Sequence, residues 1–258
     1  QVEQITKGPD GKLYINLGDA LNEQNAQSNT VLAGRIIRMN MDGTNVETYA
    51  KGLRNPFGAD WRPGTNQLFA TDNSPDTNDR LLRIVQGENY LWGAGGTGYV
   101  GKAIDLLNPS PVDVEFNPGG NSFPGELTGR MYVAVGGPIY QQGPTNGKEI
   151  LEYTLDASGN IIGERQFLKY TGTGYGTPIG LDFGPDGLYF TDIYGEPGFV
   201  GVGETEGNIY RIKPGAGSGC VNCGSGSFRA ALSVAPWYPK YISSTNKVEY
   251  VFECNGID

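Results

Sequence analysis

The sequence predicts an all-β chain folded as a β-propeller, and three observations support this prediction. Glycine and proline are abundant, with Gly 41 and Pro 16 among 258 residues, and they follow no collagen-like period. Segments made of a turn and a strand recur at intervals of 55 to 63 residues, as they do in proteins built from repeated sheets. A second strand pattern follows each of these segments. We therefore expect one domain of short strands joined by many turns.

Each repeat opens with a turn and continues into a strand that is anchored on Leu or Met beside an aromatic residue. The segments are GPDGKLYINLGD from Gly8, RPGTNQLFATDN from Arg62, GRMYVAVGG from Gly129 and GPDGLYFTDIYG from Gly184. Their anchors are Leu13, Leu68, Met131 and Leu188, which are 55, 63 and 57 residues apart. This regular spacing predicts about four propeller blades in the chain.

A partner strand follows each anchor strand and ends in a tight turn. The partners are GRIIRMNMDG from Gly34, RLLRIVQG from Arg80, EILEYTLDASG from Glu149 and NIYRIKPG from Asn208. Their alternating or continuous apolar patterns are typical of half-buried or buried strands. Two strands in each blade are thus visible, and the remaining length must supply the others.

The connections between these strands differ in composition. Residues 18–33 and 193–207 are long polar loops after anchor strands, and in a propeller such loops gather at one face, where a ligand would bind. Residues 93–121 are rich in Gly, Pro and Asn and are interpreted as a crossover between blades. We expect residues 1–215 to form the blades and residues 216–258 to form a Gly/Ser linker and a cysteine-containing tail. Residues 247–254 alternate like a strand, which either docks on a blade or belongs to the tail.

Charge and composition exclude several classes of function. The net charge is −9 and the longest basic cluster runs only from Arg35 to Arg38, so nucleic acid and anionic membranes are not expected partners. Histidine is absent, which excludes a Ser-His-Asp or Cys-His mechanism and an imidazole-bound zinc within this chain. No apolar run approaches the roughly 20 residues that span a bilayer.

Three cysteines, Cys220, Cys223 and Cys254, lie near the end of the sequence. Their spacing without histidine fits neither a haem attachment site nor a zinc site. We expect a disulfide that joins Cys220 or Cys223 to Cys254 and leaves one thiol over. A disulfide needs an oxidising compartment, so the sequence predicts an exported protein, secreted or periplasmic.

One stretch resembles a known family. It contains GLRNPFG from Gly52, an acidic loop at residues 72–79 and RIVQGENYLWG from Arg83. This combination resembles the soluble glucose/sorbosone dehydrogenase family, six-bladed propellers that bind pyrroloquinoline quinone (PQQ) and calcium. The resemblance implies an N-terminally incomplete member, whose partners include further blades on a missing N-terminal segment; a closed four-bladed ring is the alternative.

The resemblance also implies a reaction. In this family a histidine takes a proton from a sugar hydroxyl while hydride passes to PQQ, and calcium polarises the quinone. The histidine precedes the first GPDG-type turn by about nine residues, a position that falls just before Gln1. We therefore assign no catalytic residue within this chain and expect the general base to lie outside it.

Arg54 and Asn55 match the Arg-Asn pair of the family, which faces the cofactor. A guanidinium suits a carboxylated quinone because it can bind a carboxylate through two hydrogen bonds. The alternative is that Arg54 pairs with a carboxylate at the blade edge while Asn55 shapes a turn. Phe57 stands where some members carry Gln.

The loop at residues 72–79 matches the calcium loop of the family. The resemblance gives as ligands the carbonyls of Ser74 and Pro75 and the side chain of Asp79, all hard oxygen donors that calcium prefers. Ser74 replaces a Gly, which strains the match if the position needs a positive φ. The alternative is an Asx-turn loop that is satisfied by its own side chains.

Two departures from the family remove positive charge. Residues 134–137 stand where the family places a Lys, and residues 174–180 stand where it places two arginines. Each lost charge-assisted hydrogen bond is worth about 1.5–3 kcal/mol, so PQQ affinity should be weak. Several tyrosines either line a sugar-binding channel or belong to blade cores, and these are Tyr99, Tyr140, Tyr175 and Tyr194.

Two functions therefore remain open. The first is an exported, PQQ- and calcium-dependent dehydrogenase of aldoses or sorbosone-type sugars, with a small-molecule sugar as partner. The second is a non-catalytic propeller of the same family that has lost the cofactor site and acts as a scaffold or binding protein. Residues 188–192 are also similar to repeats of calcium-dependent lactonases and YWTD-type receptor propellers, but those families do not account for RNPFG.

Overall fold

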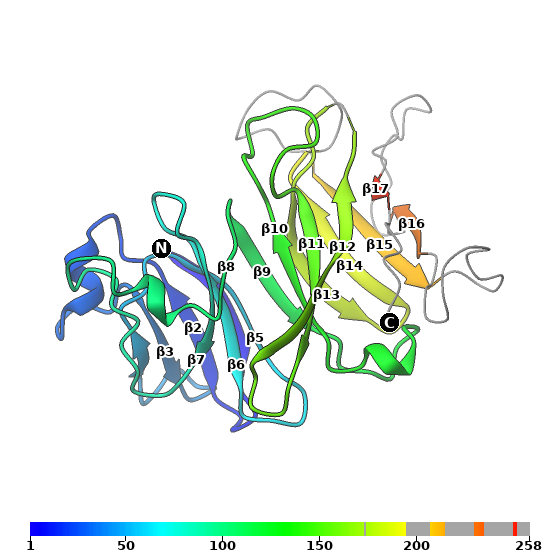
Figure 1. Cartoon of the computed structure of the whole chain (residues 1–258). Coiled ribbons are helices and arrows are strands. Elements are labelled where there is room, and N and C mark those ends of the chain that lie inside the picture. The colour runs from blue at the N-terminus through cyan, green and yellow to red at the C-terminus, as the bar shows by residue number, and fades with distance from the viewer. Residues whose placement is uncertain (173, 195–206, 215–229, 235–249, 252–258) are drawn as a thin grey trace.

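The computed structural model describes residues 1–172, 174–194, 207–214, 230–234 and 250–251. Four antiparallel sheets make up this part of the chain, and each has its strands in sequence order apart from one added edge strand. Figure 1 shows the sheets fanned side by side from the N-terminus onward. The prediction of an all-β propeller with about four blades is therefore confirmed.

Each sheet forms one blade. Blade 1 contains β1 (Val2–Lys7), β2 (Leu13–Leu17), β3 (Arg35–Met39) and β4 (Glu47–Lys51). Blade 2 contains β5 (Pro56–Trp61), β6 (Leu68–Asp72), β7 (Arg80–Ile84) and β8 (Asp105–Leu106). Blade 3 contains β9 (Pro111–Phe116), β10 (Met131–Val135), β11 (Glu149–Leu155), β12 (Ile161–Tyr170) and the edge strand β17 (Tyr250–Val251). Blade 4 contains β13 (Pro178–Gly184), β14 (Gly187–Asp192), β15 (Asn208–Pro214) and β16 (Ala230–Val234).

The repeat anchors occupy equivalent places in the blades. Leu13, Leu68 and Met131 begin β2, β6 and β10, and Leu188 is the second residue of β14. The supposed crossover at residues 93–121 instead contains β8 and β9. The sequence pattern did not predict these two strands. β8 has only two residues, and β9 lies in a stretch rich in Pro and Asn.

Two strands from beyond residue 215 pair with the blades. β16 pairs with β15, and β17 pairs with β12 through Lys169 opposite Val251 and Tyr170 opposite Tyr250. Residues 250–251 thus dock on blade 3, one of the two alternatives for this segment. The three cysteines lie outside the described residues, and the boundary at residue 215 stays a prediction.

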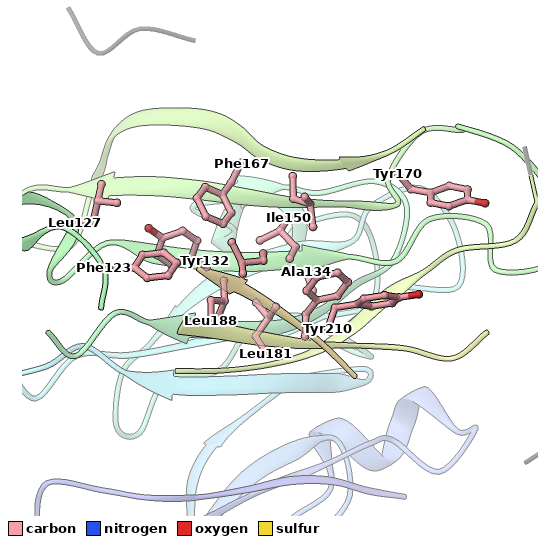
Figure 2. Packing of buried hydrophobic residues seen from close by; sticks show 13 residues of the cluster. Phe123, Leu127, Tyr132, Ala134, Ile150, Phe167, Tyr170, Leu181, Leu188 and Tyr210 are labelled. Carbon is pink, nitrogen blue, oxygen red and sulfur yellow. The ribbon is translucent and has the colours of Figure 1, made fainter. Parts of the chain in front are cut away.

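Apolar side chains between neighbouring blades form the core. Blades 1 and 2 enclose a cluster that includes Tyr14, Ile36 and Leu68, and blades 2 and 3 enclose one that includes Phe69 and Phe116. Blades 3 and 4 enclose a third cluster, in which Tyr132, Phe167 and Leu188 pack together (Figure 2). Neighbouring blades are therefore held together by the apolar clusters between them, and these four blades share no single core.

A ladder of carboxylates joins the innermost strands of blades 2, 3 and 4. These strands contact one another in chain order, and side chains on one blade accept backbone N–H groups of the next. The acceptor and donor pairs are Asp60 with Phe116 (2.9 Å), Asp113 with Leu181 (2.7 Å) and Glu115 with Phe183. Burial and the nearby carboxylates raise the pKa of Asp60 to about 6, of Asp113 to about 7 and of Glu115 to about 9.

We expect this ladder to make folding pH-dependent. A carboxyl whose pKa is higher in the folded than in the unfolded chain stabilises fully below its unfolded pKa, and that contribution is lost as the pH rises through the folded pKa. The free energy of unfolding should therefore fall from about pH 5 towards pH 9 by several kcal/mol, because each unit of pKa shift is worth about 1.4 kcal/mol. Glu115→Gln, whose amide oxygen still accepts the Phe183 N–H, should flatten this fall.

Urea unfolding at several pH values checks the expectation. Glu115→Gln should match the wild type near pH 5 and be more stable than it at pH 8–9. The control is Glu126→Gln, which changes an exposed carboxylate in the 3₁₀ helix η3 (Gly125–Leu127) and should keep the wild-type slope. Equal slopes for Glu115→Gln and the wild type would contradict the role of the ladder.

Helical structure is minor in the described chain. Besides η3, the 3₁₀ helices η1 (Glu23–Gln27) and η2 (Val100–Lys102) lie in the long connections of blades 1 and 2. None of the described helices has the length and apolar character needed to cross a membrane.

Candidate functional site

The candidate site lies where the connection from blade 1 to blade 2 meets the loop after β6. The backbone N–H of Asp19, just beyond β2, donates to the carbonyl of Arg54 (2.8 Å). The N–H of Asn73, just beyond β6, donates to the carbonyl of Asn55 (3.1 Å). The predicted cofactor residues, just before β5, and the predicted calcium loop, just after β6, are therefore hydrogen-bonded neighbours at one end of blade 2.

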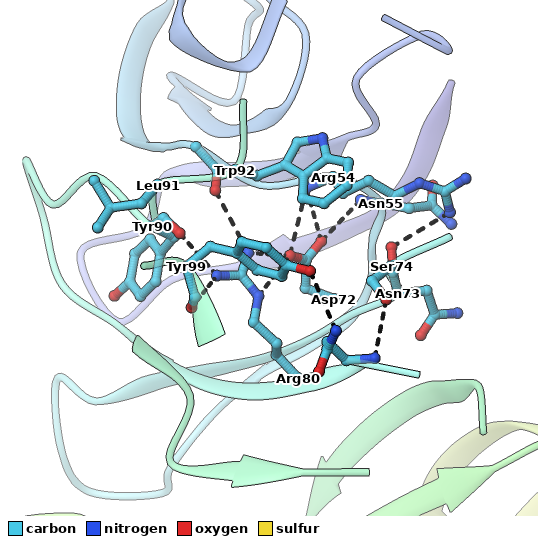
Figure 3. Close-up of polar contacts among 12 residues, drawn as sticks. Arg54, Asn55, Asp72, Asn73, Ser74, Arg80, Tyr90, Leu91, Trp92 and Tyr99 are labelled. Carbon is cyan, nitrogen blue, oxygen red and sulfur yellow. Dashed lines mark hydrogen bonds and ion pairs between the residues drawn. The ribbon is translucent and has the colours of Figure 1, made fainter. Parts of the chain in front are cut away.

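Asp72 fixes the backbone of the Arg54-Asn55 pair. Its Oδ1 accepts the N–H groups of Arg54 (3.0 Å) and Asn55 (2.8 Å), and the residue is 1% exposed. Figure 3 shows this carboxylate between those N–H groups and the guanidinium of Arg80. The turn before β5 is thus set by a buried charge and not only by Pro56.

Arg80 balances the charge of Asp72 and ties in a second loop. Its Nε donates to Asp72 Oδ2 (3.2 Å), and its Nη2 forms a further, shorter contact with the same oxygen. Its Nη1 donates to the carbonyls of Tyr90 (2.7 Å) and Tyr99 (2.9 Å), and the guanidinium lies 5.2 Å from the ring centre of Tyr99. This buried pair therefore anchors both the Arg54 turn and the connection between β7 and β8 of blade 2.

The side chains of Arg54 and Asn55 keep much of their hydrogen-bonding capacity. In the described part of the chain the Arg54 guanidinium forms no ion pair, and its hydrogen bond runs from Nη1 to the Asn73 carbonyl (3.3 Å). Asn55 is 8% exposed, yet its Oδ1 is buried without a partner there. Gly18 leaves this oxygen open, since a Cβ at Gly18 would stand 3.0 Å from it.

The three predicted calcium ligands are differently placed within their loop. Asp79 is 3% exposed, and its two oxygens accept the N–H groups of Ser74 (2.8 Å) and Ser110 (2.7 Å). Burial first, and then the charges of Asp72 and Asp76, raise the pKa of Asp79. Pro75 is at the exposed tip. Asp79 therefore also pins the connection into blade 3.

Part of this loop satisfies itself. Asp76 Oδ1 accepts the hydroxyl of Ser74 (2.6 Å) and the N–H of Asn78 (3.0 Å), and the Ser74 bond is the main reason that the pKa of Asp76 is lowered. These are the contacts expected of an Asx-type turn. This turn does not exclude calcium binding by the same loop. The turn uses the Asp76 side chain, so the Asp79 side chain and the loop carbonyls are left as possible calcium ligands.

The donor set fits calcium in its chemistry. Every candidate ligand is an oxygen, and Asn73 Oδ1 is buried in the loop with no hydrogen-bond partner among the described residues. In the same part of the chain, His, Cys, Asp and Glu form no group of three or more that could hold a metal. A calcium ion here would therefore rely on backbone and amide oxygens with one carboxylate, which calcium accepts and zinc does not.

A buried lysine lies beside Gly137, just beyond the end of β10. Lys148 follows the loop at residues 138–147, and its Cγ would be only 3.0 Å from a Cβ at Gly137. The residue is fully buried, and its Nζ donates to the carbonyls of Gln141 and Gly143. Burial lowers the pKa of Lys148, and attraction by Asp192 opposes this. The Lys148 ammonium thus serves to hold the loop at residues 138–147.

The tyrosines proposed for a sugar channel divide between core and surface. Tyr99 is buried beneath Arg80, and Tyr194 is buried and stacks on Tyr175, with ring centres 5.1 Å apart. Tyr140 is 64% exposed. The aromatic residues therefore serve mainly in packing at this rim.

Sequence reasoning missed Asp72 and Arg80, although one signal pointed to Asp72. An Asp stands four residues after the anchors Leu68 and Leu188, at Asp72 and Asp192. In blade 4, Asp192 Oδ1 accepts the N–H of Thr177 (3.0 Å), which precedes β13 as Asn55 precedes β5. The repeat of Asp at this position could have identified a structural carboxylate from the sequence. No sequence signal connects Arg80 to the site.

Part of the sequence is similar to known sugar dehydrogenases. The sequence model described as Glucose / Sorbosone dehydrogenase matches residues 2–111. Quinoprotein glucose dehydrogenase B of Acinetobacter calcoaceticus is 25% identical over 122 residues, which are 36% of this chain and 25% of that protein. Aldose sugar dehydrogenase YliI of Escherichia coli is 28% identical over 95 residues, 32% of this chain and 26% of that protein.

A solved structure agrees in fold. The PQQ-bound form of aldose sugar dehydrogenase from Streptomyces coelicolor superposes with a TM-score of 0.56 at 21% identity, over 74% of this chain and 56% of that one. The chain thus spans about a quarter of the two curated relatives and about half of this structure. With its repeated blades the chain is a β-propeller, and its residues 2–111, which include the RNP turn, match the glucose/sorbosone dehydrogenase family.

Proposed function

We propose that this chain is part of a PQQ- and calcium-dependent dehydrogenase of small sugars, with PQQ held at Arg54 and Asn55. The observation that carries the proposal is that, among the described residues, one turn holds a guanidinium without an ion pair next to a buried amide oxygen without a hydrogen-bond partner. Polar groups in this state lose free energy unless a ligand completes their hydrogen bonds. A ligand with both carboxylates and N–H or O–H donors would do so.

Each residue has a stated role in this proposal. PQQ, when bound, supplies the acceptor for hydride from the sugar. Arg54 would bind a carboxylate of the cofactor, and Asn55 would accept a hydrogen bond through Oδ1. Asp72 and Arg80 would hold both residues in place without touching the ligand. The loop oxygens of Ser74, Pro75 and Asp79 would hold calcium. The proton acceptor would come from outside this chain, which has no histidine.

Dye reduction with a panel of aldoses tests the activity. The full chain, supplied with PQQ and calcium, should bind the cofactor, and the complete protein should reduce the dye when an aldose is added. The competing proposal is a non-catalytic family member, which is favoured by the uncharged stretch at residues 174–180. PQQ binding without dye reduction in the complete protein would support that alternative instead.

Calcium should stabilise the chain through Asp79. Binding to the folded state alone adds about 2.7 kcal/mol when calcium is present at a hundred times its dissociation constant. Asp79→Asn should abolish this increment, which is measured as the difference in unfolding free energy with calcium and with a chelator. Asp76→Asn is the matched control in the same loop and should keep the increment. An equal increment in wild type and Asp79→Asn would rule out Asp79 as a ligand.

We also propose that further blades pack on blade 1. Leu13 and Ile15 are only partly buried, whereas their counterparts in blades 2–4 are fully buried or nearly so. Val2 and Ile5, on the same face, are 65% and 58% exposed. Cross-linking of the complete protein from Lys7, which is exposed beside them, tests this. Links to residues outside this chain are expected, and links confined to it would contradict the proposal.

We also propose that the protein is exported, because its three cysteines suggest a disulfide, which needs an oxidising compartment. Peptide mapping without reductant should find Cys254 joined to Cys220 or Cys223. Three free thiols in protein isolated under oxidising conditions would contradict it.

A further inference from the structure

One contact recurs between neighbouring blades of this chain. A carboxylate on the innermost strand of one blade accepts a backbone N–H from the innermost strand of the following blade. Asp60 of blade 2 accepts the N–H of Phe116 in blade 3 (2.9 Å), and Glu115 of blade 3 accepts the N–H of Phe183 in blade 4. Equivalent residues therefore join blade 2 to blade 3 and blade 3 to blade 4.

Asp182 is the counterpart of these two carboxylates in blade 4. Each of the three lies opposite the aromatic residue that follows the repeat anchor, and the pairs are Asp60 with Phe69, Glu115 with Tyr132 and Asp182 with Tyr189. Side chains of directly opposed residues lie on the same face of a sheet. The Asp182 side chain is therefore on the face of blade 4 that is turned away from blade 3. It is exposed, and no described residue donates a hydrogen bond to it.

The same face of blade 4 lacks the cover that the earlier blades have. Ile209 lies opposite Thr191 in the register that pairs Ile36 with Asn16, Leu81 with Thr71 and Ile150 with Ala134. The three earlier apolar residues are 0% exposed because the following blade covers them, whereas Ile209 is 38% exposed. Thr71 is also fully buried, and its counterpart Thr191 is exposed. Blade 4 thus presents the surface on which another blade packs, with the carboxylate in place.

We infer that this face of blade 4 is an interface for a further blade of the complete protein, whose innermost strand donates a backbone N–H to Asp182. The three interfaces within the chain define the partner: an antiparallel sheet with an N–H for the carboxylate and apolar side chains for Ile209. A backbone N–H that becomes buried at such an interface needs an acceptor, and a carboxylate is a strong one. The inference concerns how blades are joined and does not depend on a bound cofactor.

A second copy of this chain fits the interface less well than a further blade does. The residue opposite the repeat anchor is aromatic in blades 2, 3 and 4, where Trp61, Phe116 and Phe183 pack towards the preceding blade. In blade 1 this position is Lys7, opposite Leu13. A second copy docking through its first blade would bring a lysine where an aromatic side chain is needed. We therefore expect the partner strand to carry an aromatic residue as its N–H donor.

Removal of the carboxylate from two lengths of the protein tests the contact. In the complete protein, Asp182→Ala should lower the thermal midpoint by about 3–8 °C, because a charge-assisted hydrogen bond is lost from an interface. In the chain of residues 1–258 the same change should leave the midpoint level or raise it slightly, since the exposed carboxylate only repels Asp113 and Glu115 there. Asp182→Asn keeps an acceptor oxygen and should preserve most of the midpoint of the complete protein.

Two controls accompany these variants. Asp60→Ala should lower the midpoint in both lengths of the protein, because its N–H donor, Phe116, is present in both. Glu126→Ala changes an exposed carboxylate on η3 and should alter neither. An Asp182→Ala variant that shifts the two proteins equally, or that leaves the complete protein unchanged, would overturn the inference.

Photo-cross-linking of the complete protein identifies the occupant. With p-benzoylphenylalanine in place of Ile209, we expect a link to a strand outside residues 1–258. The same group in place of Met41, which is 59% exposed at the turn after β3, should give no such link. A product of doubled mass from a second copy, links confined to residues 1–258, or no link at all from position 209 would each contradict the inference. PQQ binding is measured on other variants, so these outcomes do not decide the proposed function.

Discussion

Replacing Arg80 by methionine should lower the free energy of unfolding by about 3–5 kcal/mol, because it leaves a buried carboxylate without its partner. Arg80 and Asp72 are each 1% exposed. The guanidinium also donates to the carbonyls of Tyr90 and Tyr99, which would lose hydrogen bonds inside the protein. Urea unfolding followed by circular dichroism measures the loss.

Two further variants test whether the loss of stability comes from the buried charge pair. Arg83→Met removes a partly exposed guanidinium three residues further along the same strand, and should cost less than about 1 kcal/mol. Asp72→Asn combined with Arg80→Met should be more stable than Arg80→Met alone, since the uncompensated charge is gone. If Arg80→Met costs no more than Arg83→Met, the pair does not support the turn.

Replacing Arg54 by alanine should weaken PQQ binding by about 10- to 100-fold, which corresponds to the roughly 1.5–3 kcal/mol of a charge-assisted hydrogen bond. The stability of the chain should change little, because the side chain makes a single long hydrogen bond of 3.3 Å within the described structure. A loss of affinity without a loss of stability would show that this guanidinium is kept for a ligand.

A second arginine serves as the control for this variant. Arg38 lies on β3 and pairs with Glu47 and Asp10 at the turn end of blade 1, so Arg38→Ala should leave PQQ affinity unchanged. Equal effects of the two alanine variants would mean that PQQ responds to net charge and not to a site. Titration of absorbance or calorimetry at fixed calcium distinguishes these cases.

The repeats made much of the fold predictable. Anchors such as Leu68 and Met131 recur because each must be buried against the preceding blade, and this requirement leaves a period in the sequence. The sequence pattern of the outer strands is weaker. β8 consists of Asp105 and Leu106 alone, and β4 has both exposed and buried residues. These residues form strands because they pair with a neighbouring strand. Their secondary structure therefore depends on tertiary contacts more than on the local sequence pattern.

The site was predictable only where one short segment carries it. Arg54, Asn55 and the loop through Asp79 are close in sequence, and the structure makes them neighbours through backbone hydrogen bonds. Lys148 reaches Gly137 only because residues 138–147 fold back. The turn at Ala20 and Leu21, where φ is positive, could not be predicted from the sequence either, since neither residue is typical of a positive φ. Contacts of this kind depend on the folded chain.

We propose that PQQ binds at the turn of Arg54 and Asn55. Equilibrium dialysis of PQQ against the full chain in the presence of calcium tests it most directly. We predict saturable binding of one equivalent, with a dissociation constant in the micromolar range, that Arg54→Ala weakens and Arg38→Ala does not. Absence of saturable binding up to about 100 μM PQQ, in protein whose fold is confirmed by circular dichroism, would contradict the claim.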